Sequence, residues 1–275
     1  MMQEEQIEFF KIEIAGIKIE VECKYHIVLN FCHKYLASFE KPDFVVRASS
    51  EDLIAGRLPD AEKMNHFTGV AFRFADEYIE SSVICQKITE EMISFNTLLM
   101  HGSVVAKDGY AYMFTAPSGV GKTTRTKIFR NLYPDSIIVN GDKPFIKVTS
   151  TEVVACGTPW CGKEGWNTNI MVPLRAIFLL ERVKDGEESS VEEISLGKAF
   201  PFLLQQTYRS KKPELMRKTL QLLKLFDGKL KIYKYRSSPT EESVRLAYEA
   251  ARPNDEESIG GVYDSGNDSE QHLAI

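Results

Sequence analysis

Residues 116 to 124 carry the side chains in this chain that are best suited to chemistry, because they match a phosphate-binding loop with alanine in place of the first glycine. In such a loop, backbone N–H groups curl around an anion, and glycines permit the close approach that a Cβ would obstruct. Lys122 would reach the outer phosphates of a nucleotide, and the Thr123 hydroxyl would ligate Mg²⁺. The predicted nucleotide site consists of Ala116, Pro117, Ser118, Gly119, Val120, Gly121, Lys122, Thr123 and Thr124.

The loop needs a strand before it and a helix after it, and the sequence offers both. Residues 110–115 are aromatic and apolar, which is typical of a strand. Residues 122–131 carry apolar side chains at helical spacing, and the start of a helix adds a partial positive charge that favours phosphate. Ala116 fits the loop if its φ is negative. The alternative interpretation is an ordinary glycine-rich turn between a strand and a helix.

Two further residues are candidates for proton transfer. Asp142 follows the first apolar strand after the loop, where a carboxylate can hold Mg²⁺ or take a proton from an attacking hydroxyl. His101 is predicted on a strand over residues 98–106, and a hairpin with residues 110–115 would bring it near the nucleotide, where it could orient a phosphate or shuttle protons. The alternatives are a plain turn acid in Asn-Gly-Asp and a structural histidine.

Two cations are candidates for substrate or phosphate contacts. Lys163 lies in residues 157–169, a segment rich in Gly, Trp and Asn that we expect to be an ordered loop able to cover a substrate. The alternative is a packed surface loop with Trp160 in the core. We expect a helix over residues 199–208, and Arg209 ends the helical segment 205–209, from which it could reach a phosphate or simply be a solvated cation.

His101-Gly102-Ser103, the glycine-rich loop, and Asp142 about 20 residues after Lys122 together form a recognisable constellation. It resembles the C-terminal domain of HPr kinase/phosphorylase and its phosphoenolpyruvate-carboxykinase-like relatives, over about residues 75 to 250. The resemblance is strongest to bacterial HPr-kinase-like proteins with an "NDDKP" stretch and a "GTPW-GK" loop. Here these are residues 140–144 and 157–163.

The resemblance implies an α/β fold with a mixed curved sheet and helices, and it implies ATP and Mg²⁺ as cofactors. It also implies phosphoryl transfer to a hydroxyl, because relatives phosphorylate a protein serine, free serine or a serine on a peptide natural product. On this basis Asp142 would be the base or a metal ligand, His101 would contact the phosphates or the acceptor, and Lys122 and Thr123 would serve the nucleotide and the metal. Relatives often form homo-oligomers, although no pattern in the sequence indicates one.

The chain departs from the family pattern at two positions. The family usually has two adjacent acids, and here Gly141 stands at the first of them. If the missing acid held the metal, Mg²⁺ affinity should fall; if it was the base, the chain would bind nucleotide without efficient transfer. Arg125 stands where many close relatives have histidine, and it adds a charge near the phosphates or the acceptor.

Composition excludes several other classes. The chain has 275 residues, 43% of them apolar, and a net charge of −5, so it is globular and lacks the basic surface of a nucleic-acid-binding protein. No apolar run approaches the ~20 residues of a membrane span. Five cysteines without CxxC spacing argue against structural zinc and disulfides, and the acidic start lacks a signal segment, so we expect a cytoplasmic protein.

The predicted organisation is an N-terminal α+β subdomain (residues 1–95), a nucleotide-binding core (96–252) and a disordered acidic tail (253–275). The first hypothesis for function is an ATP-dependent kinase for a hydroxyl on a small molecule, peptide or protein. The second is a catalytically weakened nucleotide-binding module that recognises a peptide or protein partner, which Gly141 motivates. A third, a carboxykinase, needs metal-ligating and carboxylate-binding residues that the sequence does not reveal.

Overall fold

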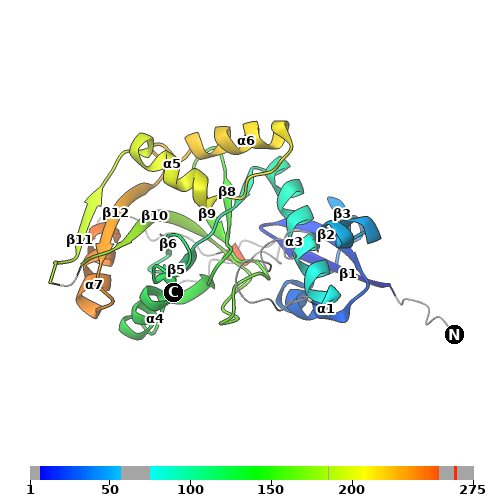
Figure 1. Cartoon of the computed structure of the whole chain (residues 1–275), viewed down its shortest axis with the longest axis horizontal. Coiled ribbons are helices and arrows are strands. Elements are labelled where there is room, and N and C mark those ends of the chain that lie inside the picture. The colour runs from blue at the N-terminus through cyan, green and yellow to red at the C-terminus, as the bar shows by residue number, and fades with distance from the viewer. Residues whose placement is uncertain (1–6, 57–74, 185, 254–262, 265–275) are drawn as a thin grey trace, which may run out of the picture. The chain divides into compact units, whose positions relative to one another are not determined.

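The computed structural model describes residues 7–56, 75–184, 186–253 and 263–264. The chain divides into two compact units, Met1–Glu91 and Met92–Ile275, so the division falls four residues before the predicted boundary at 95/96. In the described part of the chain, no helix has the length and apolar character needed to cross a membrane. The fold is mixed α/β with a curved sheet, as predicted (Figure 1).

The first unit is built on a three-stranded sheet. Strands β1 (Glu8–Ile14) and β2 (Ile17–Cys23) form an antiparallel hairpin, and β3 (Phe44–Arg47) runs parallel to β2. Both residues of the connecting turn have positive φ, 55° at Ala15 and 72° at Gly16, as a type I′ turn requires. Every second residue of β2 is buried, so one face of this sheet forms the core of the unit.

Two helices accompany this sheet. Helix α1 (His26–Cys32) and a 3₁₀ turn (His33–Tyr35) are shorter than the helix that the sequence predicts over residues 26–39, because Leu36 leaves the helix to bridge Ile12 on β1. Helix α3 (Asp76–Ser94) begins in this unit and crosses the division. Its fully buried Glu80 accepts hydrogen bonds from the backbone N–H groups of Lys24 and Tyr25.

The second unit contains a large mixed sheet in the order β4-β8-β9-β10-β6-β5-β7, with β12 and then β11 joined to β10. Its centre is parallel, because β10 pairs in parallel with both β6 and β12. The strands are β4 (Thr97–Leu99), β5 (Ser103–Lys107), β6 (Tyr110–Thr115), β7 (Ile137–Asn140), β8 (Phe145–Val148), β9 (Val153–Cys156), β10 (Ile170–Arg182), β11 (Ser190–Glu193) and β12 (Lys231–Ser237).

Helices cover both faces of this sheet (Figure 1). Helices α5 (Leu196–Gln206) and α6 (Pro213–Lys224) pack on one face, and α4 (Lys122–Leu132) and α7 (Glu241–Ala251) pack on the other. The second interface is aromatic: Phe114 stacks on Phe178 with ring centroids 5.3 Å apart, and Phe129 meets Tyr248 edge-on. These contacts hold β6, β10, α4 and α7 together, and so they fix the two ends of the glycine-rich loop.

Three sequence predictions are corrected. The strand over residues 98–106 is two strands, β4 and β5, with Met100, His101 and Gly102 between them. The helix over residues 199–208 ends at Gln206, so Arg209 lies outside it. Within the predicted disordered tail, Tyr263–Asp264 forms a short strand, β13, which pairs with β10; residues 254–262 and 265–275 lie outside the described residues.

Candidate functional site

The glycine-rich loop joins the end of β6 to the start of α4, as the sequence predicts. Gly119 and Gly121 have φ values of 80° and 115°, a region that residues with a Cβ rarely adopt. Ala116 is fully buried and has no positive φ, so its methyl group is compatible with the loop. The first N–H groups of α4 have no partner within the helix, as in any helix, and the loop presents that end.

Lys122 is buried at the base of this loop, with 8% of its surface exposed. Its ammonium group donates to the carbonyl oxygens of Ala116 at 2.9 Å and of Pro117 at 3.4 Å. Burial lowers the pKa of Lys122, and the negative charge of Asp142 opposes that shift. Thr123 and Thr124 follow in the first turn of α4, where Thr123 is partly buried and Thr124 is exposed.

Two arginines hold the loop and the helix that follows it. Arg182, at the end of β10, donates to the carbonyl oxygens of Gly119 and Val120. Arg125, predicted as a substrate or phosphate contact, is instead 3% exposed and donates to the backbone oxygen of Ser237 at 2.7 Å and to its hydroxyl at 3.2 Å. Arg125 therefore ties α4 to the end of β12. The role of Arg182 could not be predicted from the sequence, in which it is simply a charged residue after an apolar run.

His101 and Asp142 face each other. The His101 Nε2 and Asp142 Oδ1 atoms are 3.4 Å apart, and about one third of each side chain is exposed. Backbone contacts bring them together, because Gly102 N–H donates to the Asp142 carbonyl oxygen at 2.9 Å. A Cβ at Gly102 would collide with Met113 and approach the Phe114 carbonyl within 3.1 Å, so glycine permits this close packing against β6.

The Asp142 backbone is held by an Asn turn. Asn140 accepts hydrogen bonds through its side-chain oxygen from the N–H groups of Asp142 at 2.8 Å and Lys143 at 2.7 Å. The other end of the Asn140 amide donates to Thr158 at 3.0 Å. Burial raises the pKa of Asp142, but the hydrogen bond and charge of His101, with the charges of Lys143 and Lys122, outweigh it and leave the pKa lowered. Asp142 is therefore ionised at neutral pH.

The loop over residues 157–169 packs against this turn. Gly162 has a φ of 79°, and a Cβ there would lie 3.1 Å from the Cβ of Asp142. Lys163, the next residue in the chain, is exposed. Within the loop, the Asn167 amide donates to the Cys161 sulfur at 2.8 Å. None of the five cysteines forms a disulfide in the described structure, and all five are buried.

Gly141 lies in a backbone contact with no room for a side chain. Its N–H donates to the Trp166 carbonyl oxygen at 2.9 Å, and a Cβ there would lie 2.9 Å from the Cys161 carbonyl oxygen. Real Cβ atoms almost never approach so closely, and a backbone oxygen cannot rotate away. An acid at this position would therefore displace the loop over residues 157–169. The tight packing of the loop against Gly141 therefore requires glycine at the position where the family usually has its first acid.

Gly141→Ala should therefore lower the free energy of unfolding by about 1–3 kcal/mol, the usual cost of overpacking. Gly197→Ala in α5 is the matched control, because a Cβ there meets nothing within 4 Å, and it should be neutral or slightly stabilising. Urea unfolding of both variants measures the difference. Wild-type stability in Gly141→Ala would mean that the 157–169 loop moves aside at no cost.

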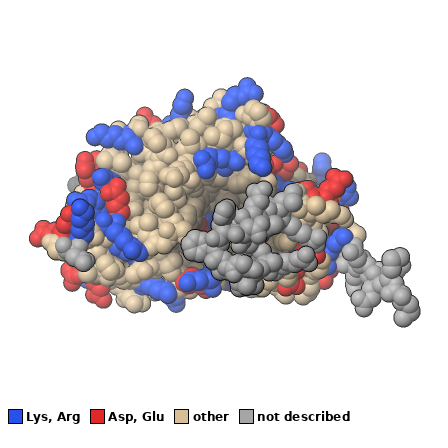
Figure 2. Space-filling view, viewed as in Figure 1, with Lys and Arg blue, Asp and Glu red and all other residues tan. Residues whose placement is uncertain are grey.

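Arg209 lies three residues beyond the end of α5 in the structure. It is exposed in the connection between α5 and α6, among other cations of that region: Lys211, Lys212, Arg217 and Lys218. Figure 2 shows Lys and Arg side chains gathered over α6, whereas both signs of charge lie over β11 and β12. Arg209 follows Gln206 by three residues, and Gln206 contacts His101.

The charges of Lys122 and Asp142 influence each other: Asp142 raises the pKa of Lys122, and Lys122 lowers the pKa of Asp142. Among the residues that the structure describes, no three His, Cys, Asp or Glu side chains cluster in a way that would hold a metal ion. The side chains of Thr123 and Asp142 carry oxygen atoms of the kind that a hard cation such as Mg²⁺ prefers. Mg²⁺ is commonly held by one or two protein oxygens together with phosphates and water, so these residues fit a metal that arrives with a nucleotide.

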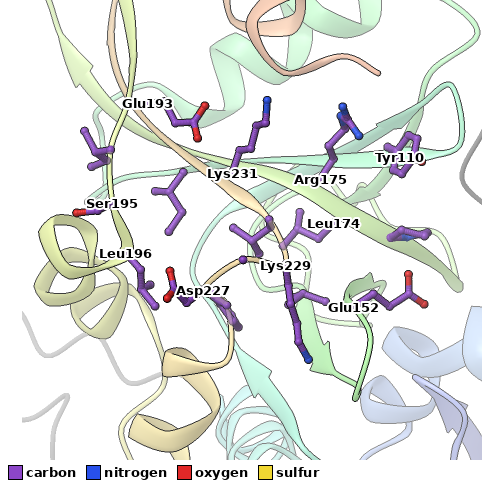
Figure 3. Close-up of a pocket in the computed structure, with 17 residues that line it drawn as sticks. Tyr110, Glu152, Leu174, Arg175, Glu193, Ser195, Leu196, Asp227, Lys229 and Lys231 are labelled. Carbon is purple, nitrogen blue, oxygen red and sulfur yellow. The ribbon is translucent and has the colours of Figure 1, made fainter. Parts of the chain in front are cut away.

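A cavity of about 500 Å³ lies at the other end of the parallel strands (Figure 3). Tyr110 at the start of β6 and Lys231 at the start of β12 line it, whereas the glycine-rich loop follows the end of β6. Its charged lining is mixed, with Arg175, Lys229 and Lys231 alongside Glu152, Glu193 and Asp227. Arg175 is engaged with the Ala251 carbonyl oxygen at 2.6 Å and with the Tyr110 ring. None of the predicted site residues lines this cavity.

The sequence matches no known protein family and no curated protein. Among solved structures, an HPr(Ser) kinase/phosphatase from Coxiella burnetii is similar to this chain at 10% sequence identity, with a TM-score of 0.27. The alignment covers 45% of this chain and 87% of that chain. At this TM-score the likeness establishes neither a shared activity nor a shared site. The geometry of the chain's own residues must therefore support any function.

Proposed function

We propose that the chain transfers the terminal phosphoryl group of ATP, bound with Mg²⁺, to a serine-like hydroxyl of a small molecule, peptide or protein. The observation that carries the proposal is an acid, Asp142, that lies 3.4 Å from His101 and whose pKa is also lowered by the charge of Lys122. A glycine-rich loop alone supports only nucleotide binding. A carboxylate within electrostatic reach of the loop lysine adds a group that can take a proton from a hydroxyl.

Each residue has a role under this proposal. The loop N–H groups and the start of α4 bind phosphate oxygens, and Lys122 neutralises their charge. Thr123 and Asp142 are the residues that would hold Mg²⁺, which when bound neutralises charge on the transferring phosphoryl group. Asp142 accepts the hydroxyl proton, and His101 orients the acceptor or the phosphate. Arg182 and Arg125 hold the loop from the ends of β10 and β12.

A weakened nucleotide-binding module is the second candidate, and Gly141 favours it. The close contact between Gly141 and Cys161 leaves no space for a second acid, so Asp142 must serve both the metal and the proton. If one carboxylate cannot do both, the chain binds ATP without efficient transfer. It would then act by recognising a peptide or protein partner in the nucleotide-bound form.

Calorimetric titration with ATP, with and without Mg²⁺, tests the shared part of both candidates. We expect binding that strengthens when Mg²⁺ is present. Incubation with ATP, Mg²⁺ and hydroxyl acceptors (free serine and serine-containing peptides) then separates them, because a kinase releases ADP in step with a phosphorylated acceptor. Absence of ADP with every acceptor argues for the binding module. Absence of ATP binding contradicts both.

A further inference from the structure

Arg182, at the end of β10, binds the outer side of the glycine-rich loop. Its guanidinium group donates from Nε to the Val120 carbonyl oxygen at 3.0 Å and from Nη2 to the Gly119 carbonyl oxygen. One planar group with its donors in a fixed fork therefore binds two successive peptide units. The contacts join residues more than 60 positions apart, so they depend on the fold and not on the local sequence of the loop.

These contacts determine where the next two N–H groups point. The peptide units here are trans, and in a planar trans unit the C=O and N–H bonds point in opposite directions. With both carbonyl groups directed outward to Arg182, the N–H groups of Val120 and Gly121 must point to the inside of the loop. The structure agrees, because Val120 N–H donates at 3.5 Å to the Pro117 carbonyl oxygen, which also accepts from the Lys122 ammonium group.

Arg125 adds a second positive charge behind the same loop. Its Nη1 donates to the Gly121 carbonyl oxygen at 3.5 Å, and its Nη2 donates to the Ser237 carbonyl oxygen at 2.7 Å. Burial lowers the pKa of Arg125, and the charge of Arg182 lowers it further. Among the residues that the structure describes, both guanidinium groups donate to uncharged oxygens alone. A buried charge is normally paired, so these two cations together favour an anion in the loop.

We propose that Arg182 is a positioning residue for phosphate: by binding two carbonyl oxygens outside the loop, it holds the N–H groups of Val120 and Gly121 toward phosphate oxygens inside it. The inference rests on the proposed function for the identity of the anion, the phosphates of ATP. Arg182 acts on the anion through the loop backbone and not by direct contact. Because the loop is ordered during folding, less of the binding free energy is lost when the anion arrives.

Three substitutions separate loop geometry from charge. Arg182→Met removes the charge and every donor but keeps an unbranched side chain. Arg182→Lys keeps the charge and a donor group but loses the planar fork that spans both carbonyl oxygens. Arg236→Met is the matched control, because Arg236 lies across from Glu181 on the neighbouring strand β12 and pairs with Glu187 instead of the loop.

One peptide unit of the loop can be observed by itself. Val followed by Gly occurs in this sequence only at residues 120–121, so protein labelled with ¹³C at the valine carbonyl and with ¹⁵N in glycine gives a single carbonyl-to-amide NMR signal. A hydrogen bond to a carbonyl oxygen moves its ¹³C resonance downfield. We expect an upfield shift of the Val120 carbonyl in Arg182→Met, a smaller shift in Arg182→Lys and none in Arg236→Met.

Calorimetric titration with inorganic tripolyphosphate, which has linked phosphates but no base or sugar, measures the consequence for binding. Without Mg²⁺, Arg182→Met should bind it about tenfold more weakly than wild type, with Arg182→Lys between them and Arg236→Met within about twofold of wild type. The difference should persist when salt is raised from about 0.05 M to about 0.5 M. Salt screens a distant charge, but it does not restore the geometry of the loop.

Three results would overturn the inference: a Val120 carbonyl signal that is the same in Arg182→Met and wild type, equal binding of tripolyphosphate by these two proteins, or a difference in binding that disappears at high salt. The carbonyl signal needs neither nucleotide nor acceptor. Tripolyphosphate binding that depends on Arg182, without phosphoryl transfer from ATP to any acceptor, would count against the proposed function alone. Thermal unfolding of each variant confirms that folded proteins are compared.

Discussion

Asp142→Asn should lower the rate of phosphoryl transfer by about 100- to 10,000-fold, the usual contribution of a general base. Asn has the same shape as Asp but cannot accept a proton. The substitution should leave the fold intact, because the contacts that hold residue 142 use its backbone: its N–H donates to Asn140, and its carbonyl oxygen accepts from Gly102. ADP release and acceptor phosphorylation, measured at saturating ATP, check the prediction.

Asp135→Asn is the control for this substitution. Asp135 is exposed and pairs with Lys107 at 2.7 Å, at the end of β5 that lies opposite the glycine-rich loop in the β5–β6 hairpin. Its replacement should leave the transfer rate unchanged. If the transfer rate of Asp142→Asn is within a few fold of the wild-type rate, the general base is another residue, and the assignment of Asp142 would be withdrawn.

ATP affinity in the same variant separates the two roles of Asp142. If Asp142 acts mainly as the base, Asp142→Asn binds ATP with Mg²⁺ as tightly as wild type and only turnover falls. If Asp142 mainly holds the metal, the advantage that Mg²⁺ gives to ATP binding shrinks as well. The lowered pKa of Asp142 fits either role, since both need an ionised carboxylate at neutral pH.

The glycine-rich loop could be predicted because everything that defines it is local in sequence. An aromatic strand, a loop with two glycines and a helix follow one another within residues 110–132, and the structure places β6 and α4 accordingly. The turn that carries Asp142 is also local, since the Asn140 side chain accepts hydrogen bonds from the N–H groups of Asp142 and Lys143, two and three residues later. Short-range patterns of this kind depend on spacing, which a single sequence contains.

The residues that sequence reasoning missed act over long separations. Gln206 meets His101 across 105 positions, and Arg182 meets the glycine-rich loop across more than 60. Neither has a local pattern that distinguishes it from other polar residues. Arg125 is the opposite case. Its position beside the loop predicted a ligand contact, but its guanidinium group donates to Ser237, 112 positions away in the sequence. Only the packing of α4 against β12 reveals that contact.

The break between β4 and β5 was also hidden. Residues 98–106 form one mostly apolar run, which by pattern is a single strand. In the structure β4 ends at Leu99; Met100 then bridges Thr207, and the His101 N–H donates to the Gln206 carbonyl oxygen. Gly102 then allows the chain to approach Met113 and enter β5. The irregular segment is the part that orients His101, so the prediction failed at a residue of the candidate site.

Lys122→Met should weaken ATP binding by about 10- to 150-fold, which corresponds to the ~1.5–3 kcal/mol of a hydrogen bond to a charged group. Lys122 donates to the carbonyl oxygens of Ala116 and Pro117 in the described structure, and phosphate oxygens would be stronger acceptors for the same ammonium group. Met keeps the length and apolar stem of lysine, so the buried site stays filled. Titration with ATP and Mg²⁺ measures the loss.

Arg130→Ala is the matched control, because Arg130 is an exposed cation in the last turn of the same helix. It changes the net charge by the same amount but should leave ATP affinity within about twofold, since exposed charges more than ~10 Å apart are largely screened at physiological salt. Equal weakening in both variants would mean that the loss reflects overall charge. Unchanged affinity in Lys122→Met would mean that the loop does not bind the nucleotide through its lysine, and the proposed function would lose its nucleotide site.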